Sequence, residues 1–94
     1  MKSDNFLKCI VDDNRRNILK FLDTKEKCVC EIINHLNLEQ SLISHHLQKL
    51  KQCGLVKSRQ DGKNIYYRIT DKQIAEVIKK IDKISSKIDF HKEC

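Results

Sequence analysis

Two cysteines separated by one residue, Cys28 and Cys30, are the side chains best suited to bind a ligand through sulfur. Lys25 and Lys27 precede them, and positive charge at a helix amino terminus favours thiolates, which bind soft ions. The segment 28–36 is predicted to be a helix. Side chains two positions apart on a regular helix point to nearly opposite faces. Both sulfurs therefore reach one ion only if the first helical turn is distorted.

A second set of side chains has the chemistry needed to read DNA. Glutamine pairs with adenine edges, serine with several bases, and lysine with guanine or phosphate. On a helix over about residues 40–52 the outward positions are Gln40, Ser41, Ser44, His45, Gln48 and Lys49. His46 falls on the inward side, so we expect it in the core. Further along, Arg59, Gln60, Lys63 and Asn64 are expected to meet the DNA backbone or minor groove.

Basic residues are concentrated in the middle of the chain. The formal net charge is +6 over 94 residues, and residues 1–39 carry as many acidic as basic side chains. Residues 40–70 carry six lysines and arginines against a single acid, Asp61. Such a block is the footprint of a surface that binds a polyanion, with an ordinary solvated basic face as the alternative.

Apolar periodicity predicts the helices that would position these groups. The predicted helices cover residues 4–11, a segment carrying Ile18 to Leu22, residues 28–36 and about 40–52. Asp12 or Asp13 is expected to cap the second, and Thr24–Lys27 to be a polar connection. The inward stripe of the fourth is predicted to be Leu42, Ile43, His46, Leu47 and Leu50. Gly54 follows where a left-handed residue ends a helix.

A β-hairpin and a final helix complete the predicted elements. Leu55–Gln60 and Lys63–Thr70 flank Asp61-Gly62, a pair that indicates a tight hairpin whose two central residues have positive φ. This wing covers about residues 55–70. A helix over about 71–90 carries the apolar stripe Ile74, Val77, Ile78, Ile81, Ile84 and Ile88. So small a domain has little core left for that stripe to cover, so we expect it to pair with its copy in a homodimer.

The predicted fold is therefore mainly α with a small β-hairpin. We expect one domain over residues 1–94, a winged helix-turn-helix of five helices and a two-stranded wing. The second helix of such a motif enters the major groove, so the expected partner is double-stranded operator DNA.

Three stretches give the sequence a resemblance to the ArsR–SmtB group of metal- and thiol-responsive repressors. Residues 28–32 are similar to that group's Cys-Val-Cys-Asp/Glu-Leu segment, and residues 44–50 resemble its Ser-Arg-His-Leu helix. Residues 54–56, 61–63 and 67–69 match its wing. The resemblance extends from about Asp12 to Ile74, and implies a homodimer that binds a palindromic operator and releases it on ligand binding. His45 replaces the usual Arg, and Glu39 the usual Ser or Thr cap.

The resemblance implies an effector ion at Cys28 and Cys30, either arsenite or antimonite, As(III)/Sb(III), or cadmium or lead, Cd(II)/Pb(II). No cofactor is expected for DNA binding itself. Ile33 stands where one branch of the group has its third sulfur, so that thiolate must come from elsewhere. By resemblance to cadmium- and lead-responsive relatives, which recruit amino-terminal cysteines across the dimer, Cys9 is one candidate. Cys94, with His91 and Glu93 nearby, is the alternative.

The resemblance also bears on the role of Cys53 and on a second metal site known in that group. Cys53 stands where the group has a small buried residue, so we expect it to pack. The group's zinc or nickel site on the last helix is expected to be absent, because Gln73 replaces a histidine. Two alternatives stay open for Cys28 and Cys30: redox or persulfide sensing through the same thiols, and no ligand at all.

Other classes of protein are disfavoured. No acid–base pair, phosphate loop or nucleophile–histidine arrangement indicates an enzyme. No apolar run approaches the roughly 20 residues that span a bilayer, and no signal peptide is visible. We therefore expect a cytoplasmic protein whose cysteines are free thiols or metal ligands rather than structural disulfides.

Overall fold

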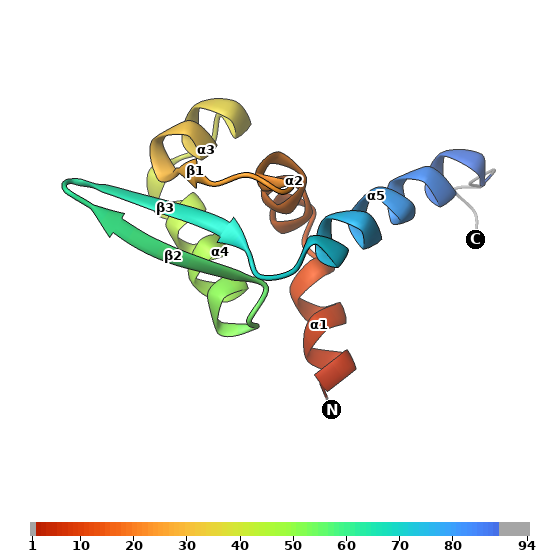
Figure 1. Ribbon diagram of the computed structural model, residues 1–94. Coiled ribbons are helices and arrows are strands. Elements are labelled where there is room, and N and C mark those ends of the chain that lie inside the picture. Colours follow the sequence, from red (N-terminus) through yellow and green to blue (C-terminus); the bar gives the residue numbers. More distant parts are fainter. Residues whose placement is uncertain (1, 89–94) are drawn as a thin grey trace.

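Five helices and three short strands make up residues 2–88, the part of the chain that the computed structural model describes. In chain order they are α1 (Lys2–Ile10), α2 (Asp13–Leu22), β1 (Lys27–Cys28), α3 (Val29–Leu36), α4 (Gln40–Gln52), β2 (Val56–Asp61), β3 (Asn64–Ile69) and α5 (Lys72–Lys87). The β2–β3 hairpin projects from one side of the helices and α5 from the other (Figure 1). This is the predicted winged helix-turn-helix, with a third strand added.

Local capping sets where the helices begin and end. Asp12 caps α2, because its carboxylate accepts a hydrogen bond from the Arg15 amide at 3.1 Å. Asn37 ends α3 in the left-handed region (φ 54°), a conformation that asparagine tolerates. Gly54 follows α4 with φ 78°, as predicted. These turns place α4 across α3 and direct the chain into the wing.

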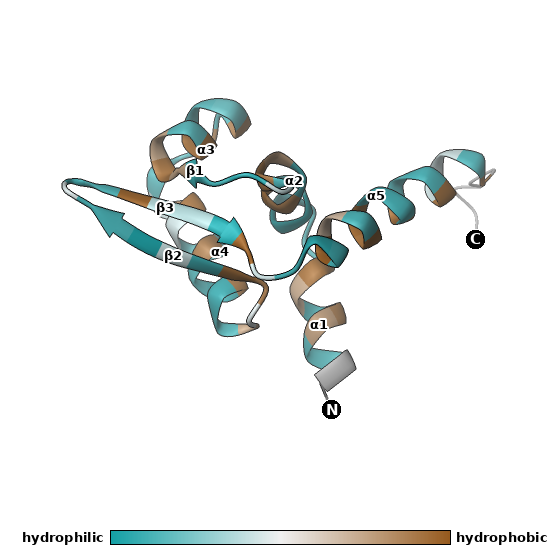
Figure 2. Cartoon of the chain, viewed as in Figure 1, coloured by the Kyte–Doolittle hydropathy of each residue, from teal (hydrophilic) through white to brown (hydrophobic). Residues whose placement is uncertain are grey.

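One apolar core joins all five helices to the base of the wing. Its largest fully buried side chains are Ile18, Leu19, Leu22, Ile32, Ile43, Leu47, Leu50, Ile78 and Cys9. Figure 2 shows the hydrophobic segments gathered where the helices face one another. The predicted inward stripe of α4 is correct except at Leu42, which is 37% exposed. Leu42 lies at the edge of that face, where α3 no longer covers it.

The sheet departs from the sequence prediction in two ways. Its strand order is β1-β3-β2, because Lys27 and Cys28 pair with Tyr67 and Tyr66 instead of belonging to a loop and a helix. The hairpin turn also lies one residue later than predicted, since Asp61 pairs with Asn64. Gly62 has φ 62° but Asp61 is not in the positive region, so one central residue of the turn, not two, is left-handed.

Helix α5 packs on the core mainly through side chains of its amino-terminal half. Asp71 caps it, and Ile74, Ala75 and Ile78 are buried. Two ion pairs also join α5 to α2. Asp82 of α5 lies 2.9 Å from Lys20 of α2, and Lys79 of α5 lies 3.0 Å from Asp23, the residue that caps the carboxyl end of α2. The helix ends at Lys87, so the last positions of the predicted 71–90 segment lie outside the described residues.

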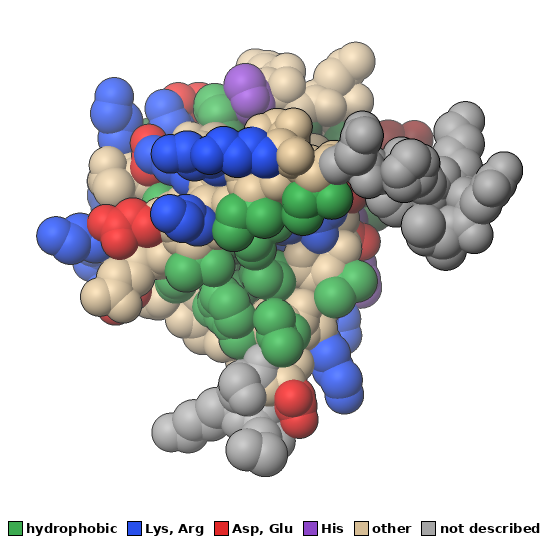
Figure 3. Space-filling view, turned by 90° about the vertical axis from the view of Figure 1, so that its right-hand side faces the viewer, with side chains coloured by type: hydrophobic (Ala, Val, Ile, Leu, Met, Phe, Trp, Pro, Cys, Tyr) green, Lys and Arg blue, Asp and Glu red, His purple; other side chains and the backbone are tan. Residues whose placement is uncertain are grey.

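An apolar surface is left uncovered along α5 and α1. The exposed side chains are Leu7, Val11, Val77, Ile84 and Ile88. Figure 3 shows hydrophobic side chains gathered on the face that includes these helices. Within residues 2–88 no helix is both long enough and apolar enough to cross a membrane.

Candidate DNA interface and thiol site

The outward face of α4 is open to solvent. All six side chains predicted to read DNA are exposed: Gln40, Ser41, Ser44, His45, Gln48 and Lys49. Glu39 takes the N-cap position with extended backbone, but its carboxylate makes no capping hydrogen bond. The first amide groups of α4 therefore stay available to donate hydrogen bonds to a phosphate oxygen.

His46 belongs to the core, as expected. It is 4% exposed, and its Nδ1 accepts a hydrogen bond from Arg15 Nε at 3.3 Å, while Asp12 lies 3.9 Å from its Nε2. Burial lowers the pKa of His46 below 6.5, Arg15 lowers it further, and Asp12 opposes the shift. A buried imidazole is thus built into the inner face of α4.

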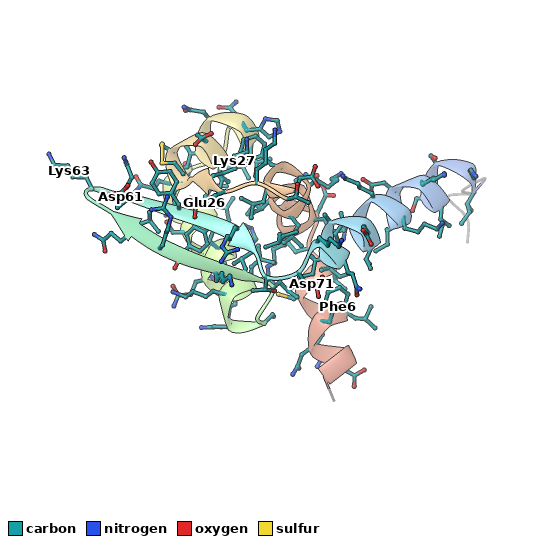
Figure 4. The ribbon with its side chains drawn as sticks, in the orientation of Figure 1. Phe6, Glu26, Lys27, Asp61, Lys63 and Asp71 are labelled. Atoms are coloured by element: carbon teal, nitrogen blue, oxygen red, sulfur yellow. A yellow bond between two sulfur atoms is a disulfide. The ribbon has the colours of Figure 1, made fainter. Side chains whose placement is uncertain are left out.

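The predicted DNA contacts of the wing differ in how free their side chains are. Lys63 and Asn64 are exposed at the tip (Figure 4). Arg59 makes a bidentate pair with Glu26 at 2.7 and 2.8 Å and lies 4.8 Å from the Tyr66 ring. The pair raises the pKa of Arg59 and lowers the pKa of Glu26. A phosphate must therefore compete with Glu26 for this guanidinium, which the sequence prediction did not anticipate.

Cys28 and Cys30 lie together at the start of α3. Cys28 precedes the helix with extended backbone (φ −68°, ψ 147°), and its Sγ accepts a hydrogen bond from the Cys30 amide at 3.2 Å. A disulfide joins the two residues, whose Cα atoms are 5.2 Å apart. The predicted helix 28–36 begins one residue later than expected, at Val29, because pairing with β3 keeps Cys28 extended. The expectation of free thiols is corrected for this pair.

This disulfide closes a loop too short to stabilise the chain appreciably by restricting its unfolded state. The Glu31 carboxylate already secures the turn by accepting a hydrogen bond from the Cys28 amide at 3.1 Å. Cys28 is buried and Cys30 is exposed. The pair is therefore suited to reversible chemistry at the surface more than to structural support.

A groove of about 470 Å³ brings the thiol pair and the predicted DNA contacts together. Its walls come from the start of α3, the outer face of α4 and strand β3. Lining residues include Cys28, Cys30, Gln40, Ser44, Gln48, Lys63 and Asn64. Its floor is apolar and aromatic, with Leu47, Ile65 and Tyr67. A group bound to the sulfurs would thus lie between the reading helix and the wing.

The other cysteines are elsewhere. Cys9 is 1% exposed and lies beside Cys53, in a pocket at the carboxyl end of α4. In one chain it is therefore not a third ligand for Cys28 and Cys30, and Cys94 lies outside the described residues. Among residues 2–88 no three histidine, cysteine or acidic side chains are grouped so that they could hold a metal ion.

Sequence reasoning missed Glu26 and the neighbouring placement of Cys9 and Cys53. Glu26 is 33 positions from Arg59, and no local pattern marks such a pair. Cys53 was assigned a packing role, although its position beside Gly54 already placed it at the end of α4.

Comparisons with known proteins agree with this geometry. A family model described as bacterial regulatory protein, arsR family, matches residues 12–58. The chain is 40% identical over 84 residues to an HTH-type transcriptional regulator of Methanocaldococcus jannaschii, covering 88% of this chain and 94% of that protein. It is 39% identical over 74 residues to the cadmium resistance regulatory protein CadC of Listeria innocua, covering 78% of this chain but 62% of CadC.

A solved structure matches the fold over nearly the whole chain. The homodimeric winged helix-turn-helix DNA-binding domain of a Mycobacterium bovis protein superposes with a TM-score of 0.82 at 26% identity. The match covers 96% of this chain and 84% of that one. The helices, the wing and α5 thus form an arrangement that another DNA-binding protein shares.

Proposed function

The chain belongs to the arsR family of bacterial regulatory proteins, and we propose that it is a repressor which leaves its operator when the Cys28–Cys30 pair binds a soft ion. That it is a DNA-binding transcriptional regulator follows from the family. The effector, the residues that contact DNA and the assembly are the proposal. No cofactor is needed for DNA binding.

The main support for this proposal is that the two sulfurs and the outward face of α4 line one groove. Gln40, Ser44 and Gln48 line the same groove as Cys28 and Cys30. Because β1 is hydrogen-bonded to β3, displacement of Cys28 would also displace the wing. Chemistry at the sulfurs would therefore act on both DNA-contacting elements at once.

The donor set fits a soft, three-coordinate ion better than a hard one. Thiolates prefer such ions, and the groove floor offers no carboxylate. As(III), Sb(III), Cd(II) and Pb(II) are the candidates, and the similarity to CadC favours this class. Because Cys9 lies at the other end of α4, its use would require a second copy of the chain. We propose Cys94 as the third donor and keep Cys9 of a partner chain as the alternative.

A homodimer is the proposed assembly. The exposed side chains Val77, Ile84 and Ile88, with Leu7 of α1 and Val11 just after it, form an apolar face that a second copy would bury. The related Mycobacterium bovis domain is homodimeric. Two-fold symmetry would present two α4 helices to major grooves about 34 Å apart. An effector releases DNA if it binds more tightly to dimers that lack this spacing. The expected coupling free energy between effector binding and DNA binding is about 1–3 kcal/mol.

A second candidate function is redox sensing by the same residues. The observation that favours it is the Cys28–Cys30 disulfide itself. Oxidation of the reduced pair would then replace ion binding as the event that releases DNA.

Titration of reduced protein on its own upstream DNA tests these alternatives. Arsenite or Cd(II) should raise thiolate-to-metal ultraviolet absorption and lower the fluorescence anisotropy of labelled DNA together. The combined variant Cys28→Ser, Cys30→Ser should bind DNA but ignore the ion, whereas Cys53→Ser should respond as wild type does. A full response in the combined variant would overturn the proposal. Release by hydrogen peroxide with no response to any ion would favour the redox candidate.

The DNA contacts need a separate measurement. Gln40→Ala, Ser44→Ala and His45→Ala should each cost about 1–3 kcal/mol on the operator and little on random DNA. Lys63→Ala should weaken binding to both alike, because a phosphate contact carries no sequence information. Equal losses on both DNAs for the α4 variants would remove them from the base-reading set.

A further inference from the structure

A second pair of cysteines holds the amino-terminal helix against the end of α4. Cys9 lies on α1 and Cys53 caps the carboxyl end of α4. The Cys9 thiol donates a hydrogen bond to the Lys49 carbonyl at 3.6 Å, and the Cys53 thiol donates one to the Asn5 carbonyl at 3.9 Å. Each thiol thus contacts the backbone one turn before the other cysteine. This reciprocal arrangement places the two sulfurs side by side.

The surroundings of the pair differ between its two members. Cys9 is 1% exposed, whereas Cys53 is only partly buried. Both line a pocket of about 320 Å³ that also includes the cationic side chains Lys8 and Arg15. Burial, together with Cys53, raises the pKa of Cys9 to about 12, against an opposing effect of Arg15. Cys9 therefore stays a thiol while Cys53 is the one that reagents reach.

We propose that Cys9 and Cys53 are a reactive thiol pair that a hydroperoxide converts into a disulfide joining α1 to the end of α4. The Cys53 thiolate attacks the distal peroxide oxygen, the O–O bond breaks, and the protonated leaving group departs as an alcohol or water. Cys53 is then a sulfenic acid. The Cys9 thiol gives its proton to the sulfenic oxygen as its sulfur displaces the hydroxyl group, which forms the S–S bond and releases one water. Two thiols are oxidised and one peroxide is reduced.

This site is separate from the one proposed for the effector. It lies at the opposite end of α4 from the groove, and none of its lining residues lines that groove. Oxidation would fix α1, which carries the exposed Leu7 and leads into the exposed Val11, against the helix that carries the side chains proposed to read DNA. Peroxide would thereby fix the position of the apolar face on α1 relative to the outward face of α4. Cys28 and Cys30 would not need to change.

The test uses the full-length variant Cys28→Ser, Cys30→Ser, Cys94→Ser, which retains only Cys9 and Cys53. After reduction, a small excess of hydrogen peroxide should lower the count of free thiols from two to zero. The intact mass should fall by the mass of two hydrogen atoms, and peptide mapping should find Cys9 linked to Cys53. Dithiothreitol should restore both thiols. Adding Cys9→Ser should instead leave a sulfenic acid at Cys53 that dimedone traps.

Three results would overturn the proposal: two thiols that persist, oxidation of Cys53 without a link to Cys9, or a disulfide only between chains. Should the triple variant not fold, peptide mapping of peroxide-treated wild type distinguishes a Cys9–Cys53 link from a Cys28–Cys30 link directly. The outcome is independent of whether the effector proposal holds, because that site is absent from the triple variant.

Discussion

The two ends of α4 each adjoin a cysteine pair, and the pairs differ in almost every physical respect. Cys28 and Cys30 open onto the groove between α4 and the wing, with Cys30 exposed. Cys9 and Cys53 lie beneath α1, where Cys9 is almost fully buried. The first pair is close in sequence and is joined because β1 holds Cys28 extended. The two cysteines of the second pair are distant in sequence, and the packing of α1 against α4 brings their free thiols together.

The difference teaches that the reactivity of a thiol is decided by its surroundings more than by its spacing. An exposed sulfur in a groove can exchange ligands with solvent. A sulfur enclosed by two helices can react only with its neighbour or with small reagents that enter the pocket. Each of the following predictions tests part of this contrast.

The largest expected difference is in the rate of alkylation. In reduced wild type at pH 8, iodoacetamide should modify Cys30 at least about 100-fold faster than Cys9, since only the thiolate reacts. A pKa of about 12 leaves a thiolate fraction at Cys9 of roughly 10⁻⁴ at that pH. Peptide-level mass spectrometry over time measures both rates. Comparable rates would show that the two ends of α4 are not chemically distinct.

A smaller contrast is expected in stability. Cys9→Ser places a hydroxyl where a buried thiol packs, and should lower the free energy of unfolding by about 1–2 kcal/mol. Cys30→Ser, at an exposed position, should change it by less than about 0.5 kcal/mol. Urea denaturation of the reduced proteins provides the comparison. If Cys30→Ser proves the more damaging, the pair at the start of α3 supports the fold after all.

The Glu26–Arg59 pair joins the segment before β1 to strand β2 of the wing. Glu26→Gln should free Arg59 for a phosphate, so that the slope of log K against log[salt] becomes steeper by about one. Glu76→Gln, which removes the same charge from an exposed site on α5, is the matched control. Fluorescence anisotropy on random DNA at several salt concentrations measures the slopes. Identical slopes in the two variants would show that Arg59 does not meet the backbone.

The smallest expected effect is on pH dependence, at the middle of α4. Because burial lowers the pKa of His46 in the folded state, the unfolded chain binds this proton first as the pH falls below 6.5. The contribution of His46 to stability is therefore fully present above pH 6.5 and is lost as the pH falls toward its lowered folded value. His46→Gln should flatten the decline in the free energy of unfolding between pH 7.5 and pH 5.5, as estimated from urea curves.

His45→Gln is the control for that measurement, because His45 is adjacent but exposed. It should keep the wild-type slope. An unchanged slope in His46→Gln as well would mean that the buried imidazole is not the group that titrates.

Much of the fold could be predicted because its signals are local. Helical periodicity located α2, α4 and α5, the cap of α2 was limited to Asp12 or Asp13, and Gly54 was expected to be the left-handed residue after α4. The wing followed from an alternating pattern around a glycine. The exposure of the six α4 side chains also followed from periodicity alone.

The features that sequence could not give depend on contacts between distant segments. Strand β1 is two residues long, and only the edge of β3 makes it a strand. Cys28 is extended for that reason and precedes α3, although the sequence predicted it to be the first residue of that helix. Glu26 with Arg59, and Cys9 with Cys53, come together only when the sheet and the helices pack.

The pairing of β1 with β3 also gives the protein an optical property. The chain contains no tryptophan, and its two tyrosines, Tyr66 and Tyr67, are the β3 residues opposite Cys28 and Lys27. All tyrosine emission of the folded chain therefore originates from the part of β3 that pairs with β1, and Tyr67 lines the groove that holds the sulfurs. A heavy ion held there would quench it, so the occupancy of the groove could be followed in unlabelled protein, without DNA and without a dye.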